Sequence, residues 1–116
     1  MSDVTQKFGV GGFLYNHTTR CVLLHHRDGN TIHNPNRWAF FTGLNEPDET
    51  PVNAFIRELR EELGVELARK DVIPLCDYFN EVDAFGFIGN VYVFFVFALV
   101  HNIAEHIINK NLKFFF

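Results

Sequence analysis

The chain has few residues of the kind that form covalent or metal cross-links. It contains 2 cysteines in 116 residues, Cys21 and Cys76, and their separation matches no metal-binding spacing. Both lie in apolar runs, where buried structural thiols are common. We therefore expect a reduced, cytoplasmic protein, with a disulfide as the less favoured alternative.

Basic residues and long apolar runs are also scarce. The sequence has 10 Lys and Arg against 14 Asp and Glu, a formal net charge of −4, which argues against a nucleic-acid surface. The longest apolar run, residues 91–100, is too short to cross a bilayer as a helix. Residues 1–7 are polar and lack a signal-peptide core. We expect one domain, 1–116, with its own core and no membrane association.

Segments typical of β-strands alternate with turn-rich segments along the sequence. We expect strands at residues 8–16, 20–25, 38–41, 72–80 and 91–101, with turn-rich stretches at 28–37 and 81–90. The last strand is rich in β-branched and aromatic residues, which predicts burial on both faces. Residues 103–110 are ambiguous between helix and loop. A helix between the third and fourth strands completes the pattern, which favours an α/β or α+β sandwich with a mixed sheet.

The helix has a recognisable start and end. Thr50 followed by Pro51 is typical of an N-cap and first helical position, and Gly64 is typical of the left-handed residue just past the end. Between them, apolar residues recur at helical spacing and form one stripe. These residues are Val52, Phe55, Ile56, Leu59 and Leu63.

Acidic residues crowd beside this apolar stripe. At about 100° per residue, Glu58, Glu61 and Glu62 fall within one sector, with Glu62 expected nearest the buried edge. Each like-charge pair one turn apart costs an isolated helix about 0.2–0.5 kcal/mol. Three hard oxygen ligands on one rigid face suit Mg²⁺ or Mn²⁺ and not zinc. The alternative interpretation is a solvated acidic face, the usual meaning of a charge run.

Residues 43–65 resemble the Nudix box at every defining position. The pattern is Gly, five residues, Glu, seven residues, Arg-Glu, an aliphatic, any residue, Glu-Glu, any residue, Gly and an aliphatic. It is filled by Gly43, Glu49, Arg57, Glu58, Leu59, Glu61, Glu62, Gly64 and Val65. Residues 23–27 and 38–41 also resemble strands of many members, so the resemblance extends over about residues 8–100.

The resemblance implies a Nudix-type α/β/α sandwich and hydrolysis of a nucleoside diphosphate linked to another group. It implies that Mg²⁺ or Mn²⁺ binds to Glu58, Glu61, Glu62 and the backbone carbonyl of Thr42. The alternative role for one of these glutamates, Glu58 before the others, is that of general base. The sequence does not separate the two roles, because coupled carboxylates share their protons.

The resemblance also assigns roles to the residues around these carboxylates. Arg57 would join Glu58 and Glu61 in catalysis, and its pairing with Glu49 would hold the loop against the helix. Gly43 and Gly64 would be structural.

The resemblance implies the type of reaction but does not identify the substrate. Arg27, Trp38 and Phe40 are candidate substrate contacts, although Trp38 at a strand start equally suits the core. Nucleoside triphosphates, dinucleoside polyphosphates, nucleotide sugars and capped RNA ends all stay open. A nucleotide-binding or regulatory Nudix module with little turnover is the alternative to an active pyrophosphohydrolase.

Several positions depart from the usual family pattern. Thr42 and Asp48 stand where many members have glycine, and Pro47 stiffens the loop between them. The chain also looks shortened at its C-terminus, because it stops soon after the last long strand. Its three terminal phenylalanines, residues 114–116, either complete the domain's own sheet or form the seam of a homodimer.

Overall fold

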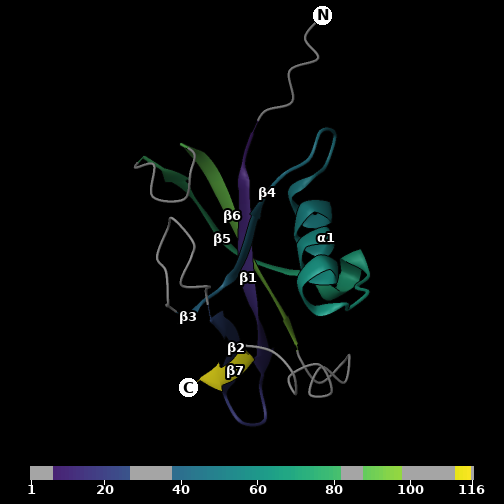
Figure 1. The fold of residues 1–116 in the computed structure, drawn as a ribbon, viewed down its shortest axis with the longest axis vertical. Helices are drawn as coiled ribbons and strands as arrows, with labels where there is room; N and C mark the ends of the chain where they lie inside the picture. Colours follow the sequence, from purple (N-terminus) through teal and green to yellow (C-terminus); the bar gives the residue numbers. More distant parts are fainter. Residues whose placement is uncertain (1–6, 27–37, 82–87, 98–111, 116) are drawn as a thin grey trace, which may run out of the picture.

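The computed structural model describes residues 7–26, 38–81, 88–97 and 112–115. The order of elements is β1 (Gly9–Asn16), β2 (Cys21–His26), β3 (Trp38–Ala39), β4 (Phe41–Leu44), α1 (Pro51–Leu63), the 3₁₀ turn η1 (Arg69–Asp71), β5 (Ile73–Asn80), β6 (Gly89–Phe97) and β7 (Leu112–Phe115) (Figure 1). Within the described residues, no helix is both long and apolar enough to cross a membrane.

The sheet is mixed and is built around β1 and β6, which are parallel neighbours. β5 pairs antiparallel with β6 at one edge. On the other side of β1, β4 pairs with its first half and β2 with its last residues, and both β3 and β7 pair with β2. Since β4 and β5 both run against the central pair, they are parallel to each other, and α1 lies on the crossover between them.

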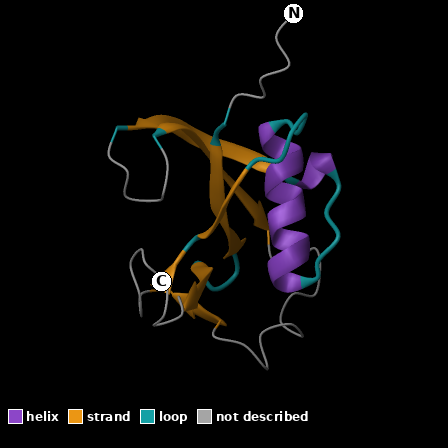
Figure 2. Cartoon of the chain, turned by 45° about the horizontal axis from the view of Figure 1, so that its top comes forward, coloured by secondary structure: helices purple, strands orange, loops and turns teal. Residues whose placement is uncertain are grey.

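α1 covers one face of this sheet (Figure 2). Phe55 and Leu59 of the helix are fully buried and belong to the same core cluster as Val10 of β1 and Phe94 of β6. Gly12 of β1 allows this close packing, because a side chain there would overlap the Phe94 carbonyl and meet the Phe55 ring. The predicted helix on a mixed sheet is therefore present, and its apolar stripe faces the core.

The predicted strand at residues 38–41 is wrong in its extent. The structure breaks it at Phe40 and continues as β4 to Leu44. The longer strand forms because residues 41–44 pair with Gly9–Gly12 of β1, a contact between segments that are distant in the sequence. The predictions for residues 28–37 and 103–110 lie outside the described residues.

Burial differs from expectation on the edge strand β5 and on the central strand β6. Cys21 is buried as predicted, but Cys76 is exposed, because it lies on β5, a strand at the edge of the sheet; both thiols are free. β6 buries Val91 and Val93 on one face and Phe94 and Val96 on the other, while Phe95 and Phe97 remain partly exposed. The prediction of a strand buried on both faces thus holds for only part of β6.

The C-terminal residues that the structure describes belong to the domain's own sheet. β7 pairs antiparallel with β2, and Phe115 lies opposite Val22. This arrangement favours the first of the two interpretations of the terminal phenylalanines, in which they complete the sheet.

Candidate active site

The helix that carries the acidic residues is fixed at both ends by local hydrogen bonds. The Thr50 hydroxyl accepts a hydrogen bond from the Asn53 N–H at 3.2 Å, and Pro51 begins the helix. At the other end Gly64 takes the left-handed conformation, with φ of 71°, and its N–H donates to the Arg60 carbonyl at 2.8 Å. Both predicted caps are therefore confirmed, and they set where the acidic sector begins and ends.

Arg57 is the centre of the site, and its side chain is only 10% exposed. Its Nε and Nη2 donate to Glu49 at 2.7 and 3.0 Å, and Nη2 also donates to the Leu44 carbonyl at 2.8 Å. Glu49 in turn accepts the Glu46 N–H at 2.7 Å, which closes the loop before the helix. The predicted pair between Arg57 and Glu49 is present, and it joins strand β4, the loop and α1.

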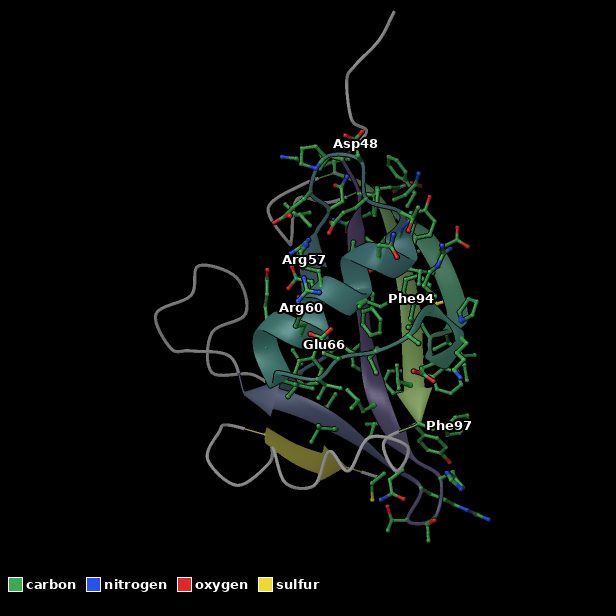
Figure 3. All side chains as sticks on the ribbon, turned by 90° about the vertical axis from the view of Figure 1, so that its right-hand side faces the viewer. Asp48, Arg57, Arg60, Glu66, Phe94 and Phe97 are labelled. Carbon is green, nitrogen blue, oxygen red and sulfur yellow. The ribbon has the colours of Figure 1, made fainter. Side chains whose placement is uncertain are left out.

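Arg57 also gathers two of the helix carboxylates. Its Nη1 lies 3.1 Å from Glu58 Oε1 and 3.3 Å from Glu61 Oε1. The Glu58 side chain is 13% exposed, whereas the Glu61 side chain is 54% exposed. One guanidinium therefore holds a largely buried carboxylate and a solvent-facing one. Figure 3 labels Arg57 on the helix, below the loop that carries Asp48.

These contacts shift the acid–base properties of the site. The hydrogen bond from Arg57 lowers the pKa of Glu49, and the same bond raises the pKa of Arg57. Burial raises the pKa of Glu58, and the charge of Arg57 offsets part of that rise. Glu58 thus carries a negative charge whose desolvation is not fully compensated, which is the position where an added cation gains most.

Gly43 explains how β4 and the helix come so close at this point. A side chain at Gly43 would overlap the Glu58 carboxylate. The absence of a side chain therefore lets Glu58 lie against the strand backbone. The Thr42 carbonyl belongs to the peptide unit that leads into Gly43, so this predicted backbone ligand lies next to the least exposed carboxylate.

Glu62 does not lie where the sequence predicts. Glu62 is exposed. Glu58 is more deeply buried than Glu62, because β4 packs against the side of the helix that carries Glu58. In the described part of the chain, no three His, Cys, Asp or Glu side chains are gathered into a preformed metal cluster. Glu58 and Glu61 are already together, and Glu62 follows Glu58 by one helical turn, a spacing that makes them neighbours on the helix surface. This set of hard oxygen atoms fits Mg²⁺ or Mn²⁺.

The candidate substrate contacts are dispersed. Arg27 lies outside the described residues, as does the side chain of Trp38, whose backbone begins β3. The ring of Phe40 packs on Phe13 with 5.1 Å between centroids. Since Phe13 alternates with the core residue Leu14 along β1, Phe40 lies on the sheet face opposite α1.

A small cavity of about 90 Å³ lies beside the Thr42–Gly43 peptide. It is lined by Gly9, Val10, Thr42, Gly43, Leu44, Tyr78 and Val91. Tyr78 was not among the sequence candidates. It lies on β5, and the strand order β4-β1-β6-β5 places it at the same cavity as the residues of β4.

Comparison with known proteins identifies the family. A model of the NUDIX domain matches residues 5–111. The chain belongs to the Nudix family. A mouse protein, nucleoside diphosphate-linked moiety X motif 6, is 33% identical over 82 residues, which are 71% of this chain and 25% of that protein. The chain thus spans about a quarter of the length of the curated relatives it matches.

Solved Nudix structures agree with the fold. The Escherichia coli ORF135 protein is 28% identical, with a TM-score of 0.57 over 78% of this chain and 59% of that one. The Nudix domain of Shewanella oneidensis NrtR, solved with ADP ribose, is 18% identical, with a TM-score of 0.61 over 81% and 61%. The predicted Nudix fold with a mixed sheet is confirmed, and the described residues contain one of its helices. Nudix proteins generally use divalent metals.

Proposed function

We propose that this Nudix chain is a metal-dependent hydrolase that cleaves a pyrophosphate bond in a nucleoside diphosphate linked to another group. The observation that carries the proposal is the arrangement around Arg57. One guanidinium holds the loop through Glu49 and contacts both Glu58 and Glu61, and Glu58 lies against Gly43. Two of the three helix carboxylates, Glu58 and Glu61, are therefore oriented by the fold before any ligand arrives.

Each residue has a role that follows from its environment. Glu58, Glu61, Glu62 and the Thr42 carbonyl would hold Mg²⁺ or Mn²⁺, which when bound supplies positive charge for phosphate oxygens and lowers the pKa of water. Glu58 is also the best candidate to accept a proton, because burial raises its pKa towards neutrality. Arg57 fixes the direction of both Glu58 and Glu61.

The cavity beside Thr42 is the proposed position for a substrate group outside the phosphates. Tyr78 is 44% exposed and offers an aromatic surface there. The ADP ribose in the NrtR Nudix domain shows that a fold of this kind accepts a nucleotide ligand. We therefore favour a nucleotide as substrate.

Release of phosphate and pyrophosphate from a panel of nucleoside diphosphate derivatives, with Mg²⁺ or Mn²⁺, tests the proposal. The wild-type chain should turn over at least one compound, and a Glu61→Gln, Glu62→Gln double variant should lose that turnover. Glu66→Gln is the control, because Glu66 follows the helix and is 74% exposed. Equal turnover by the double variant and the control would contradict the assigned carboxylates.

A nucleotide-binding module with little turnover is the second candidate. It is favoured by the exposed position of Glu62, since Arg57 gathers two of the three helix carboxylates, Glu58 and Glu61. Binding of ADP ribose in the presence of metal, without product release, would identify this function.

A further inference from the structure

A side chain extends the pairing of β1 with β4 by one residue. The regular register of the two strands ends at the pair of Gly9 and Leu44. One residue further along, the Asn45 N–H donates to the Phe8 carbonyl at 3.1 Å. The Phe8 N–H in turn donates to the side-chain carbonyl oxygen of Asn45, Oδ1, at 2.9 Å. Asn45 therefore satisfies both backbone groups of Phe8, one through its backbone and one through its side chain.

This arrangement lets the chain leave the sheet at Asn45. In an antiparallel ladder, the Phe8 N–H would donate to the backbone carbonyl of the residue opposite. The Asn45 Oδ1 takes that position instead, so the backbone after Asn45 can turn away while the part-buried Phe8 N–H stays bonded.

Phe8 is a fixed point for these two bonds. Its ring packs edge-on against Tyr92 of β6, with 5.6 Å between the ring centroids. Both rings pack on the core cluster that includes Phe55 and Leu59 of α1. A loop that is bonded to Phe8 is therefore held relative to the same core that holds the helix.

The turn that follows Asn45 leads directly to a partner of Arg57. The Glu49 N–H donates to the Glu46 carbonyl at 3.2 Å, and Asp48, at the third position of this turn, has a φ of 66°. A positive φ at the third position is typical of a type II turn. The turn brings the Glu49 carboxylate to 2.7 Å from the Arg57 Nε.

Asn45 thus lies between the two groups that hold the Arg57 guanidinium. Nη2 donates at 2.8 Å to the carbonyl of Leu44, the residue before Asn45. Nε and Nη2 donate to Glu49, four residues after Asn45. Nη1 of the same group contacts the two helix carboxylates described above. Because a guanidinium is planar and rigid, the bonds of Nε and Nη2 fix where Nη1 points.

We propose that Asn45 is a positioning residue for the carboxylates that would bind the metal. It fixes where the chain leaves β4, and so the direction from which Arg57 holds Glu58 and Glu61. The inference rests on the proposed function for the identity of the metal ligands, whereas the coupling of Asn45 to Arg57 does not depend on it. Replacing a side chain that orients metal ligands typically weakens metal binding about 10–100-fold.

Mn²⁺ titration of the whole chain, followed by the electron paramagnetic resonance signal of the unbound ion, tests this role. Asn45→Ala removes the acceptor and should weaken Mn²⁺ binding at least about fivefold. Asn45→Asp keeps an oxygen at the same place, and about 0.3 M salt screens its added charge. It should therefore bind Mn²⁺ within about twofold of the wild type. Far-UV circular dichroism checks that each variant is folded.

The matched control is Asn16→Ala. Asn16 lies at the other end of β1, and its Oδ1 also accepts backbone N–H groups, those of Thr18 at 3.0 Å and Thr19 at 3.2 Å. This variant should lose stability but keep the Mn²⁺ affinity of the wild type. If Asn45→Ala likewise lost stability alone, or if both variants lost Mn²⁺ affinity equally, the proposal would be overturned.

A second measurement needs no metal. Urea unfolding of Asn45→Ala, Arg57→Lys and the double variant completes a double-mutant cycle. If Asn45 acts through Arg57, Asn45→Ala should lower the folding equilibrium constant at least about threefold more in the wild type than in Arg57→Lys. Effects that simply add would overturn the proposal. This result decides the role of Asn45 even where the wild type binds no Mn²⁺ and the proposed function itself fails.

Discussion

At the scale of single residues, Arg57 joins more parts of the site than any other described side chain. It donates to Glu49 and to the Leu44 carbonyl, and it also contacts Glu58 and Glu61. Arg57→Lys would keep the charge but lose the planar pair of bonds to Glu49. We expect a loss of about 2–3 kcal/mol in the free energy of unfolding, measured by urea titration.

The control for this prediction is Arg60→Lys on the same helix. Arg60 is 48% exposed and lies 4.0 Å from Glu66. Exposed pairs of this kind contribute about 0–1 kcal/mol, so the substitution should be almost neutral. Equal losses from the two substitutions would show that Arg57 does not organise the site.

The pair of Arg57 and Glu49 also predicts how stability depends on pH. The folded state lowers the pKa of Glu49 below its ordinary value of 4.5. The pair's contribution is therefore fully present well above pH 4.5 and is lost as the pH falls below it towards the folded-state pKa. Unfolding free energies measured from pH 7 to pH 3 should show this loss in the wild type. In Glu49→Gln the corresponding part of the pH dependence should disappear; an unchanged profile would contradict the assignment.

Asp48 shows how this chain departs locally from its family. It has a φ of 66°, a left-handed conformation that glycine adopts without strain. Glycine, which many Nudix proteins have here, should therefore stabilise the chain. We expect Asp48→Gly to raise the unfolding free energy by up to about 1 kcal/mol, and Asp48→Val to lower it, because a β-branched residue is a strong outlier at positive φ. A thermal melt in which Asp48→Gly is the less stable variant would contradict this account.

At the scale of elements, the contact between β4 and α1 decides the position of Glu58. Gly43→Ala would push its methyl group into the Glu58 carboxylate. We expect at least a tenfold loss of metal-dependent turnover together with about 1–3 kcal/mol of destabilisation. Kinetic assays beside urea unfolding measure both quantities.

Gly64→Ala is the matched control for this change. Gly64 has φ of 71°, and a methyl group added there would meet no described atom within 4 Å, so an alanine strains the helix end without touching the site. It should lose about 1 kcal/mol of stability and keep its turnover per folded molecule. If both variants lost turnover equally, helix stability and not the Glu58 contact would be the cause.

Local signals predicted the helix better than they predicted its surroundings. Thr50, Pro51 and Gly64 set its ends through short-range hydrogen bonds, so the sequence alone located it. The extent of β4 and the burial of Glu58 were not predictable in this way. Both depend on β1 lying beside residues 41–44, a pairing that no local pattern specifies.

At the scale of the whole molecule, the order of the strands in the sheet decides which side chains reach the cavity and which are exposed. Tyr78 reaches the cavity, and Cys76 is exposed, because β5 lies at the edge beyond β6. The aromatic residues of β1 and β6 line one shallow groove because these strands are parallel and in register from Gly9 to Tyr15. The run of apolar residues in β6 predicted burial, but the amount of burial depends on what covers each face.

Metal binding should be visible in the stability of the whole domain. A ligand that binds only the folded state stabilises it by about 2.7 kcal/mol at one hundred times its dissociation constant. Mn²⁺ or Mg²⁺ should therefore raise the melting temperature of the wild type. Glu58→Gln, Glu61→Gln should lose this rise, because it removes the two carboxylates that Arg57 gathers, whereas Glu66→Gln should keep it. A metal-induced rise that persists in the double variant would place the metal elsewhere. No rise in the wild type would mean that these carboxylates alone do not hold the ion.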